Sequence, residues 1–114
     1  MNDTDLSKRF SQPVRFDLMD VGSPALAVVL PIECFLVNRT AKPWNGDFVC
    51  WPTEINISGR GLEPDVAIVD LKAKIVALYD KLSKTSSGSL KEDELKRKEY
   101  LEERIKPRKA SHGI

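Results

Sequence analysis

The spacing of hydrophobic residues between positions 25 and 82 changes from that of strands to that of one long helix. Residues 25–37 are largely apolar, and Ile32, Cys34 and Leu36 would share one face of a strand because side chains alternate across a sheet. Two shorter apolar runs follow. The pattern predicts three strands, at residues 25–37, 47–51 and 54–58, with the first two paired antiparallel through the loop 38–47.

A helix is predicted over residues 63–82, where apolar side chains recur every three or four positions (Ile68, Leu71, Ile75, Leu78 and Leu82). Pro64 suits the first helical position, where its missing N–H costs nothing. Gly59 and Gly61 are expected to take positive φ angles in a sharp turn before the helix. The apolar stripe is expected to pack on the sheet, with a coiled-coil seam as the minority alternative. Val69, Val76 and Tyr79 add a second, weaker flank suited to a partner.

The two ends of the chain complete the predicted organisation. Residues 1–24 are expected to form an N-terminal arm, in which the alternation of Val14 to Leu18 suits a short edge strand. Residues 25–83 form the predicted core, 84–88 a serine-rich linker, 89–106 a charged helix beginning with a Ser89/Glu92 capping box, and 107–114 a disordered tail. The predicted fold class is α+β: a three- or four-stranded antiparallel sheet packed by one long helix, plus a C-terminal charged helix.

Composition and charge narrow the function classes. The net charge is +1, so the whole molecule has no strong field for nucleic acid or a membrane surface. The N-terminus is polar and acidic, unlike a secretory signal, and the longest apolar run, Ala25 to Leu30, is too short to span a bilayer. We therefore expect a cytoplasmic protein that does not enter membranes.

No catalytic constellation is apparent. The single histidine, His112, lies in the polar tail, and Gly59-Arg60-Gly61 lacks the further glycine and the lysine of phosphate-binding loops. Cys34 and Cys50 are expected to be buried hydrophobes, with a bridge between neighbouring strands as the minority alternative. We expect no enzyme, no metal site and no cofactor.

Candidate binding residues fall into two groups. Trp44, in the loop beside Pro43, is a candidate interface anchor, although its ring could equally cover the end of the sheet; Trp51 is expected in the core. The predicted partner-binding residues are Trp44, Phe35, Val76 and Tyr79. The alternative is nucleic-acid binding through Arg97, Arg104, Lys106, Arg108 and Lys109, but interleaved glutamates would cancel much of their attraction to phosphates.

Two stretches, residues 46–52 and residues 61–67 with Leu71 following, resemble the HicB antitoxin family. Pro52, Gly61, Ala67 and Leu71 fall on matching positions, and the likeness covers residues 25–82. The resemblance implies a pared-down ribonuclease H-like sheet and helix without catalytic acids, which masks a small HicA-type messenger-RNA-cleaving toxin. It does not extend to the family's C-terminal DNA-binding module, which leaves a stand-alone HicB-like protein with a non-toxin partner as an alternative. A homodimer or higher oligomer is also expected.

Overall fold

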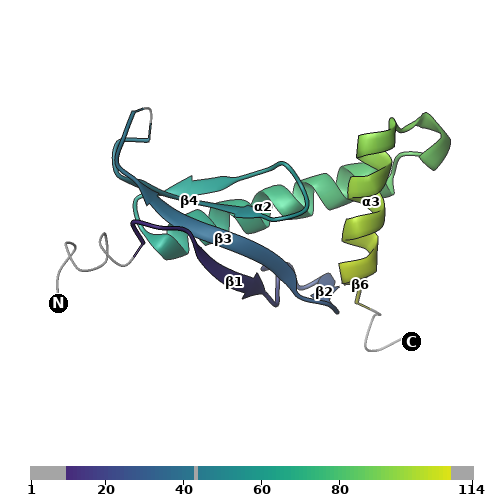
Figure 1. Ribbon diagram of the computed structural model, residues 1–114. Helices are drawn as coiled ribbons and strands as arrows, with labels where there is room; N and C mark the ends of the chain where they lie inside the picture. The colour runs from purple at the N-terminus through teal and green to yellow at the C-terminus, as the bar shows by residue number, and fades with distance from the viewer. Residues whose placement is uncertain (1–9, 43, 109–114) are drawn as a thin grey trace.

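The computed structural model describes residues 10–42 and 44–108, and it shows an α+β fold. The main sheet is antiparallel and four-stranded, in the order β1-β3-β4-β5, with the long helix α2 along one face (Figure 1). A second, two-stranded sheet pairs β2 with β6. The elements in chain order are β1 (Val14–Leu18), β2 (Leu26–Val28), β3 (Ile32–Arg39), β4 (Asp47–Pro52), β5 (Gly59–Gly61), α2 (Pro64–Ser83), the 3-10 turn η1 (Ser87–Ser89), α3 (Glu92–Arg104) and β6 (Ile105–Pro107).

The predicted edge strand in the N-terminal arm is confirmed, because β1 pairs antiparallel with β3. The antiparallel pairing across the loop 38–47 is also confirmed, with Phe35 opposite Trp51 and Val37 opposite Val49. The predicted helix over 63–82 is confirmed as α2. Its core-facing stripe is fully or almost fully buried at Ala67, Leu71, Ile75 and Leu82.

The prediction of one strand over residues 25–37 is wrong, because this stretch divides into β2 and β3, which belong to different sheets. Pro31 lies between them and cannot donate a ladder hydrogen bond. The backbone N–H of Val29 instead donates to the carbonyl of Arg104 at 2.7 Å, which extends the pairing of β2 with the C-terminal segment. Within β3 the predicted alternation holds, since Ile32, Cys34 and Leu36 are buried in the core.

The predicted third strand at 54–58 is also wrong, because the strand that pairs with β4 is Gly59–Gly61. Neither glycine has a positive φ; among the described residues that conformation occurs at Gly22, Asn45 and Gly46. The glycines are required by the close approach of α2. A Cβ on Gly59 would lie 2.4 Å from the carbonyl oxygen of Ala67, well inside van der Waals contact.

The C-terminal region differs from the prediction at both ends of its helix. The helix begins at Glu92, where the Glu94 carboxylate accepts a 3.2 Å hydrogen bond from the Lys91 N–H, whereas Ser89 lies in the preceding 3-10 turn. The helix ends at Arg104, and residues 105–107 form β6 instead of continuing the helix into a disordered tail. Ile105 is completely buried and pairs with Val28, which explains the change of conformation. Residues 109–114 of the predicted tail lie outside the described residues.

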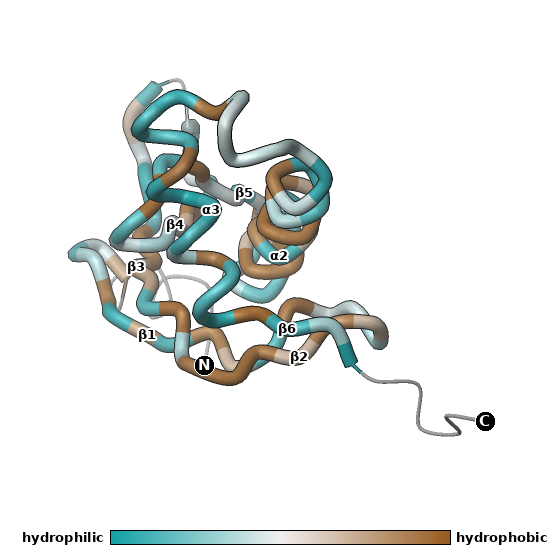
Figure 2. The backbone as a smooth tube through the Cα atoms, turned by 90° about the vertical axis from the view of Figure 1, so that its right-hand side faces the viewer, coloured by the Kyte–Doolittle hydropathy of each residue, from teal (hydrophilic) through white to brown (hydrophobic). Residues whose placement is uncertain are grey.

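The turned view in Figure 2 shows α2 and α3 as neighbouring helices, with β2 and β6 side by side beneath them. Leu101 of α3 and Ile105 belong to the same buried cluster as the α2 stripe, so the C-terminal segment is part of the core. No helix in the described ranges is long and apolar enough to cross a bilayer.

Candidate protein-binding surface

The main sheet has one face against α2 and one face without a covering helix layer, which we call the open face (Figure 1). Ile32, Cys34 and Leu36 point toward the core, so the alternate residues of β3 belong to the open face. The strand register then places the following residues on it: Arg15 and Asp17 from β1, Glu33, Phe35, Val37 and Arg39 from β3, Asp47, Val49 and Trp51 from β4, and Arg60 from β5.

Aromatic rings and guanidinium groups alternate across this face. The rings of Phe35 and Trp51 lie 6.0 Å apart between centroids. The guanidinium of Arg39 lies 5.9 Å from both the Trp51 and the Trp44 rings, and the guanidinium of Arg60 lies 4.8 Å from the Trp44 ring. We call Phe35, Arg39, Trp44, Trp51 and Arg60 the aromatic–arginine cluster. Each guanidinium is within the range in which a ring quadrupole attracts a cation.

The loop between β3 and β4 positions Trp44 by its own backbone hydrogen bonds. The N–H of Trp44 donates to Ala41 O at 2.9 Å, and Gly46 N–H donates to Arg39 O at 2.7 Å. Asn45 and Gly46 take φ angles of 50° and 94°, which glycine and asparagine tolerate best. The Asn38 side-chain amide fastens this turn by donating to Gly46 O at 2.7 Å.

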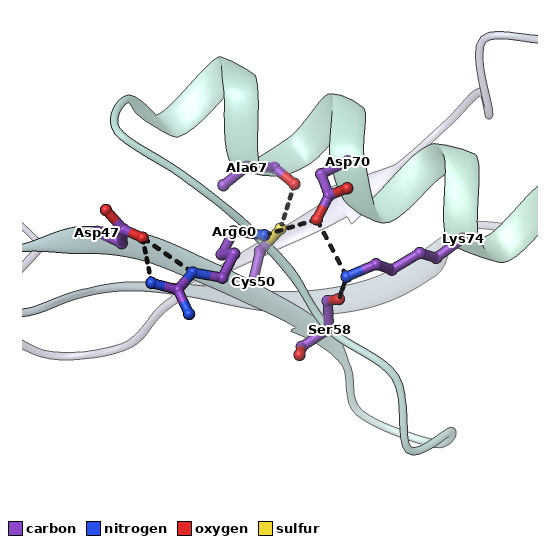
Figure 3. A network of polar contacts seen from close by, with 7 residues as sticks. All are labelled: Asp47, Cys50, Ser58, Arg60, Ala67, Asp70 and Lys74. Carbon is purple, nitrogen blue, oxygen red and sulfur yellow. Dashed lines mark hydrogen bonds and ion pairs between the residues drawn. The ribbon is translucent and has the colours of Figure 1, made fainter. Parts of the chain in front are cut away.

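The far end of the cluster is fixed by an ion pair. The Nε and Nη2 atoms of Arg60 both donate to the Asp47 carboxylate, at 2.8 and 2.5 Å (Figure 3). Asp47 is the first residue of β4, directly after the loop that holds Trp44. The pair therefore joins β5 to this loop and holds the Arg60 guanidinium near the Trp44 ring.

The cluster shields apolar side chains on the open face. Val37 and Val49 lie opposite each other on this face, yet they are only 6% and 3% exposed. Trp51 is half-buried here and does not belong to the buried core, contrary to the sequence prediction. Sequence analysis identified Trp44 and Phe35 but missed Arg39 and Arg60, whose roles depend on strands that meet only in the fold.

The other two predicted partner-binding residues lie elsewhere. Val76 and Tyr79 line a groove of about 360 Å³ between α2 and the segment leading into β2, together with Ala25 and Leu26. The structure therefore does not bring Val76 and Tyr79 together with Phe35 and Trp44. It divides the four predicted residues between the helix flank and the open face.

The residues of the nucleic-acid alternative are largely occupied within the protein. Arg97 lies 3.9 Å from the Asp93 carboxylate, and Arg104 lies 2.6 Å from that of Glu103. Arg108 donates to the carbonyl of Leu26 through Nε at 3.2 Å. Lys106 lies on β6, and Lys109 is outside the described residues.

An acidic cleft of about 520 Å³ lies between the open face and α3. The charged residues that line it are the acidic Asp17, Glu33, Glu54 and Glu103 and the basic Arg15 and Arg104. The guanidinium of Arg104 lies 3.9 Å from the centroid of the Tyr100 ring, and burial raises the pKa of Tyr100. Carboxylates outnumber guanidinium groups in this lining, so the cleft carries negative charge beside the aromatic–arginine cluster.

The two cysteines face the core as free thiols. Burial raises the pKa of Cys34 to about 12 and that of Cys50 to about 11. Cys50 Sγ lies 3.2 Å from Ala67 O, so it contacts the helix that covers it (Figure 3). Both side chains therefore stay protonated near neutral pH and act as small buried hydrophobes, as predicted. Within residues 10–42 and 44–108, no cluster of three or more histidine, cysteine or carboxylate side chains could hold a metal ion.

Comparisons of the chain with family models, with curated proteins and with solved structures find no match. The resemblance to HicB antitoxins therefore stays a prediction from the sequence.

Proposed function

We propose that this chain is a non-enzymatic protein-binding module of HicB type, which masks a small HicA-type messenger-RNA-cleaving toxin through its open face. The observation that carries the proposal is the aromatic–arginine cluster, in which two tryptophans and two arginines are preorganised on an uncovered sheet face. Tryptophan and arginine are enriched among residues that dominate binding energy at protein interfaces. Because one ion pair holds Arg60 and backbone hydrogen bonds hold the loop that carries Trp44, binding would cost little ordering of these residues.

The acidic cleft beside the cluster supports a partner that handles RNA. A protein that binds RNA needs a basic surface for the phosphates. Asp17, Glu33, Glu54 and Glu103 would face such a surface with complementary charge, which favours fast encounter and correct orientation. This chain would then block the toxin by occupying its RNA-binding site, and no chemical step would take place on this chain.

The non-enzymatic part of the proposal is supported by the state of the nucleophiles. Both thiols are buried with raised pKa values, and the sequence contains a single histidine, His112. Two free buried thiols also suit a reducing compartment, so we propose the cytoplasm as its location. We propose self-association as well, through an edge of the sheet away from Trp44.

Co-expression with the protein encoded by the adjoining gene tests this function. We expect co-purification of the pair, relief of the growth arrest caused by the neighbour alone, and loss of both in the Trp44→Ala/Arg39→Ala variant. Val69→Ala is the matched control, since Val69 is 64% exposed and lies on α2, which covers the opposite face of the sheet. A Glu54→Lys variant should slow association with a basic partner.

The possible results separate the parts of the proposal. A bound neighbour that does not cleave RNA would retain the protein-binding function and exclude the toxin. A neighbour that binds the cluster variant as well as the wild type would exclude the open face as the binding surface. Repeated recovery of the chain without any bound neighbour would contradict the proposal as a whole.

A further inference from the structure

The two edge strands of the main sheet differ in whether side chains cover their outward backbone groups. At the β5 edge, the backbone N–H of Arg60 donates to the Asp70 carboxylate at 3.0 Å, and Lys74 Nζ donates to Ser58 O at 2.8 Å (Figure 3). Asp70 and Lys74 both come from α2 and also pair with each other at 3.1 Å. Because these side chains occupy the outward backbone groups, a further strand cannot pair there without displacing them.

The opposite edge, β1, has no such cover in the described part of the chain. Thr53 N–H donates to Glu33 O at 2.9 Å, which shows that Glu33 directs its backbone groups toward β4. Alternation along β3 then directs those of Cys34 toward β1, where Cys34 is paired with Phe16. By the same alternation, Arg15 and Asp17 direct their backbone N–H and C=O groups outward, away from β3. No backbone hydrogen bond to Arg15 or Asp17 is present on that side within residues 10–42 and 44–108.

We propose that β1 pairs antiparallel with β1 of a second copy of this chain, across a two-fold axis at Phe16, so that the two main sheets become one. In this register Arg15 of each copy lies opposite Asp17 of the other. Both residues direct their backbone groups outward, so each such pair exchanges two backbone hydrogen bonds. Their side chains lie on the same open face, where opposite charges directly across two strands attract.

The charge pattern selects this register over its neighbours. A slip that keeps the hydrogen-bonding geometry moves the two-fold axis by one residue, to Arg15 or to Asp17. With the axis at Arg15, the Arg15 residues of the two copies lie opposite each other. With the axis at Asp17, the two Asp17 residues do. Both registers therefore bring like charges together. The sequence Val-Arg-Phe-Asp-Leu is therefore complementary to itself in one antiparallel register.

The charges on β1 and β3 within one copy also favour pairing with a second copy. Asp17 lies directly opposite Glu33 in the β1–β3 register, which is an unfavourable like-charge pair. Arg15 forms an ion pair with Glu33, while Asp17 has no ion pair in the described chain. Arg15 of a second copy would supply the missing positive charge on the free side of Asp17.

The other face of β1 offers apolar surface to the same partner. Val14 is 38% exposed and Phe16 is half-buried. In the proposed register the two Phe16 side chains meet at the axis, and Val14 lies opposite Leu18 of the second copy. These are the non-hydrogen-bonded pairs, in which side chains approach more closely. The contact would therefore cover apolar surface on one face while pairing charges on the other. This pairing of β1 strands deepens the self-association proposed above. It uses a sheet edge away from Trp44, but Asp17 also lines the acidic cleft, so the experiment measures dimerisation of this chain alone, without a toxin.

A charge-exchange experiment on the full chain tests this proposal by sedimentation velocity over a concentration series. The wild type should dimerise. Arg15→Asp and Asp17→Arg should each weaken the dimer by about tenfold or more, because each places like charges in both cross-strand pairs. The double variant R15D/D17R should restore the homodimer, and an equimolar mixture of the two single variants should form a heterodimer. The control, Asp65→Arg, makes the same charge change at an exposed position on α2 and should keep the wild-type affinity.

The circular dichroism spectrum of each variant shows whether a variant that no longer dimerises is still folded. The mixture gives a further safeguard, because two unfolded chains would not recover a dimer on mixing. A wild type that stays monomeric throughout the series would overturn the proposal. So would a dimer that neither single variant weakens, or single variants that remain monomeric when mixed.

Discussion

Gly59 lies so close to Ala67 that a Cβ on the glycine would be 2.4 Å from the alanine carbonyl oxygen. The same Cβ would be 2.4 Å from the backbone N of Leu71, so the obstruction is rigid helix backbone. This contact sets the distance between α2 and the β5 edge. It thereby allows α2 side chains to reach the backbone of β5.

Gly59→Ala should destabilise the protein by about 3 kcal/mol, because the added methyl group must push the helix away from the sheet. The measurement is urea unfolding, in which the midpoint should fall with little change in slope. Gly88→Ala is the matched control, since the nearest atom to a Cβ there is Ser86 Oγ at 3.9 Å. It should change stability by no more than about 0.5 kcal/mol. Equal effects of the two substitutions would contradict the close-contact interpretation.

Asp70→Ala should lower the free energy of unfolding by about 1 kcal/mol, because it removes the acceptor for the Arg60 N–H at a partly solvated edge. Burial alone would raise the pKa of Asp70, but hydrogen bonds from Arg60 N–H and Lys74 outweigh it and lower the pKa. A carboxyl whose folded pKa is lowered stabilises the fold above its unfolded pKa and loses that contribution as pH falls through the folded value.

The difference in stability between wild type and Asp70→Asn should therefore shrink below pH 3.8, the ordinary value of the group. Asn keeps an acceptor for the backbone N–H, so at neutral pH this variant should be more stable than Asp70→Ala. Urea unfolding at several pH values measures both differences. A gap between wild type and Asp70→Asn that stays constant down to pH 2 would count against the ionised carboxylate as the stabilising species.

The buried thiols should make stability fall at alkaline pH. Burial raises the pKa of Cys34 to about 12 and that of Cys50 to about 11, above the ordinary value of 9.0. Between these values the unfolded chain loses thiol protons that the folded chain keeps, so the free energy of unfolding decreases by roughly 1 kcal/mol per thiol for each pH unit. Below pH 9.0 the contribution is fully present.

Comparison with the Cys34→Ala/Cys50→Ala variant isolates this effect from the lysines and tyrosines that titrate in the same range. The variant should be less stable at pH 8 but should lose stability less steeply between pH 9 and 11. Thiol labelling provides an independent measurement: both cysteines should react slowly in the native protein and rapidly in urea. Fast labelling under native conditions would show that one of them is accessible.

Trp44 and Arg60 should be energetically coupled, because the guanidinium lies 4.8 Å from the ring centroid. A double-mutant cycle with Trp44→Ala and Arg60→Ala should give a coupling free energy of about 0.5 kcal/mol, as expected for a solvent-exposed cation–π contact. The cycle of Trp44→Ala with Val69→Ala should give none within error, since Val69 lies on α2. A zero value for the first cycle would mean that the cluster is not preorganised in solution.

The sequence predicted correctly the features set by local periodicity, and it missed those set by contacts between distant segments. The α2 stripe and the alternation of Ile32, Cys34 and Leu36 were predicted correctly, because burial of one face imposes the period of the element on the sequence. The edge strand β1 was predicted for the same reason. Gly59 and Gly61 were also recognised, but they were assigned to positive φ angles. No local pattern in the sequence indicates that a Cβ on Gly59 would lie 2.4 Å from the backbone of α2.

The chain by itself therefore determined the edge strand β1, the alternation along β3, the position of β4 and the buried stripe of α2. Tertiary structure decided the division of residues 25–37 between two sheets, the pairing of residues 105–107 with β2, and the assembly of Arg39, Arg60 and Trp44 on one face. These features depend on contacts between segments that are far apart in the sequence. Such contacts form only when the rest of the core has folded. Local periodicity carries no record of such contacts, and only the packed chain reveals them.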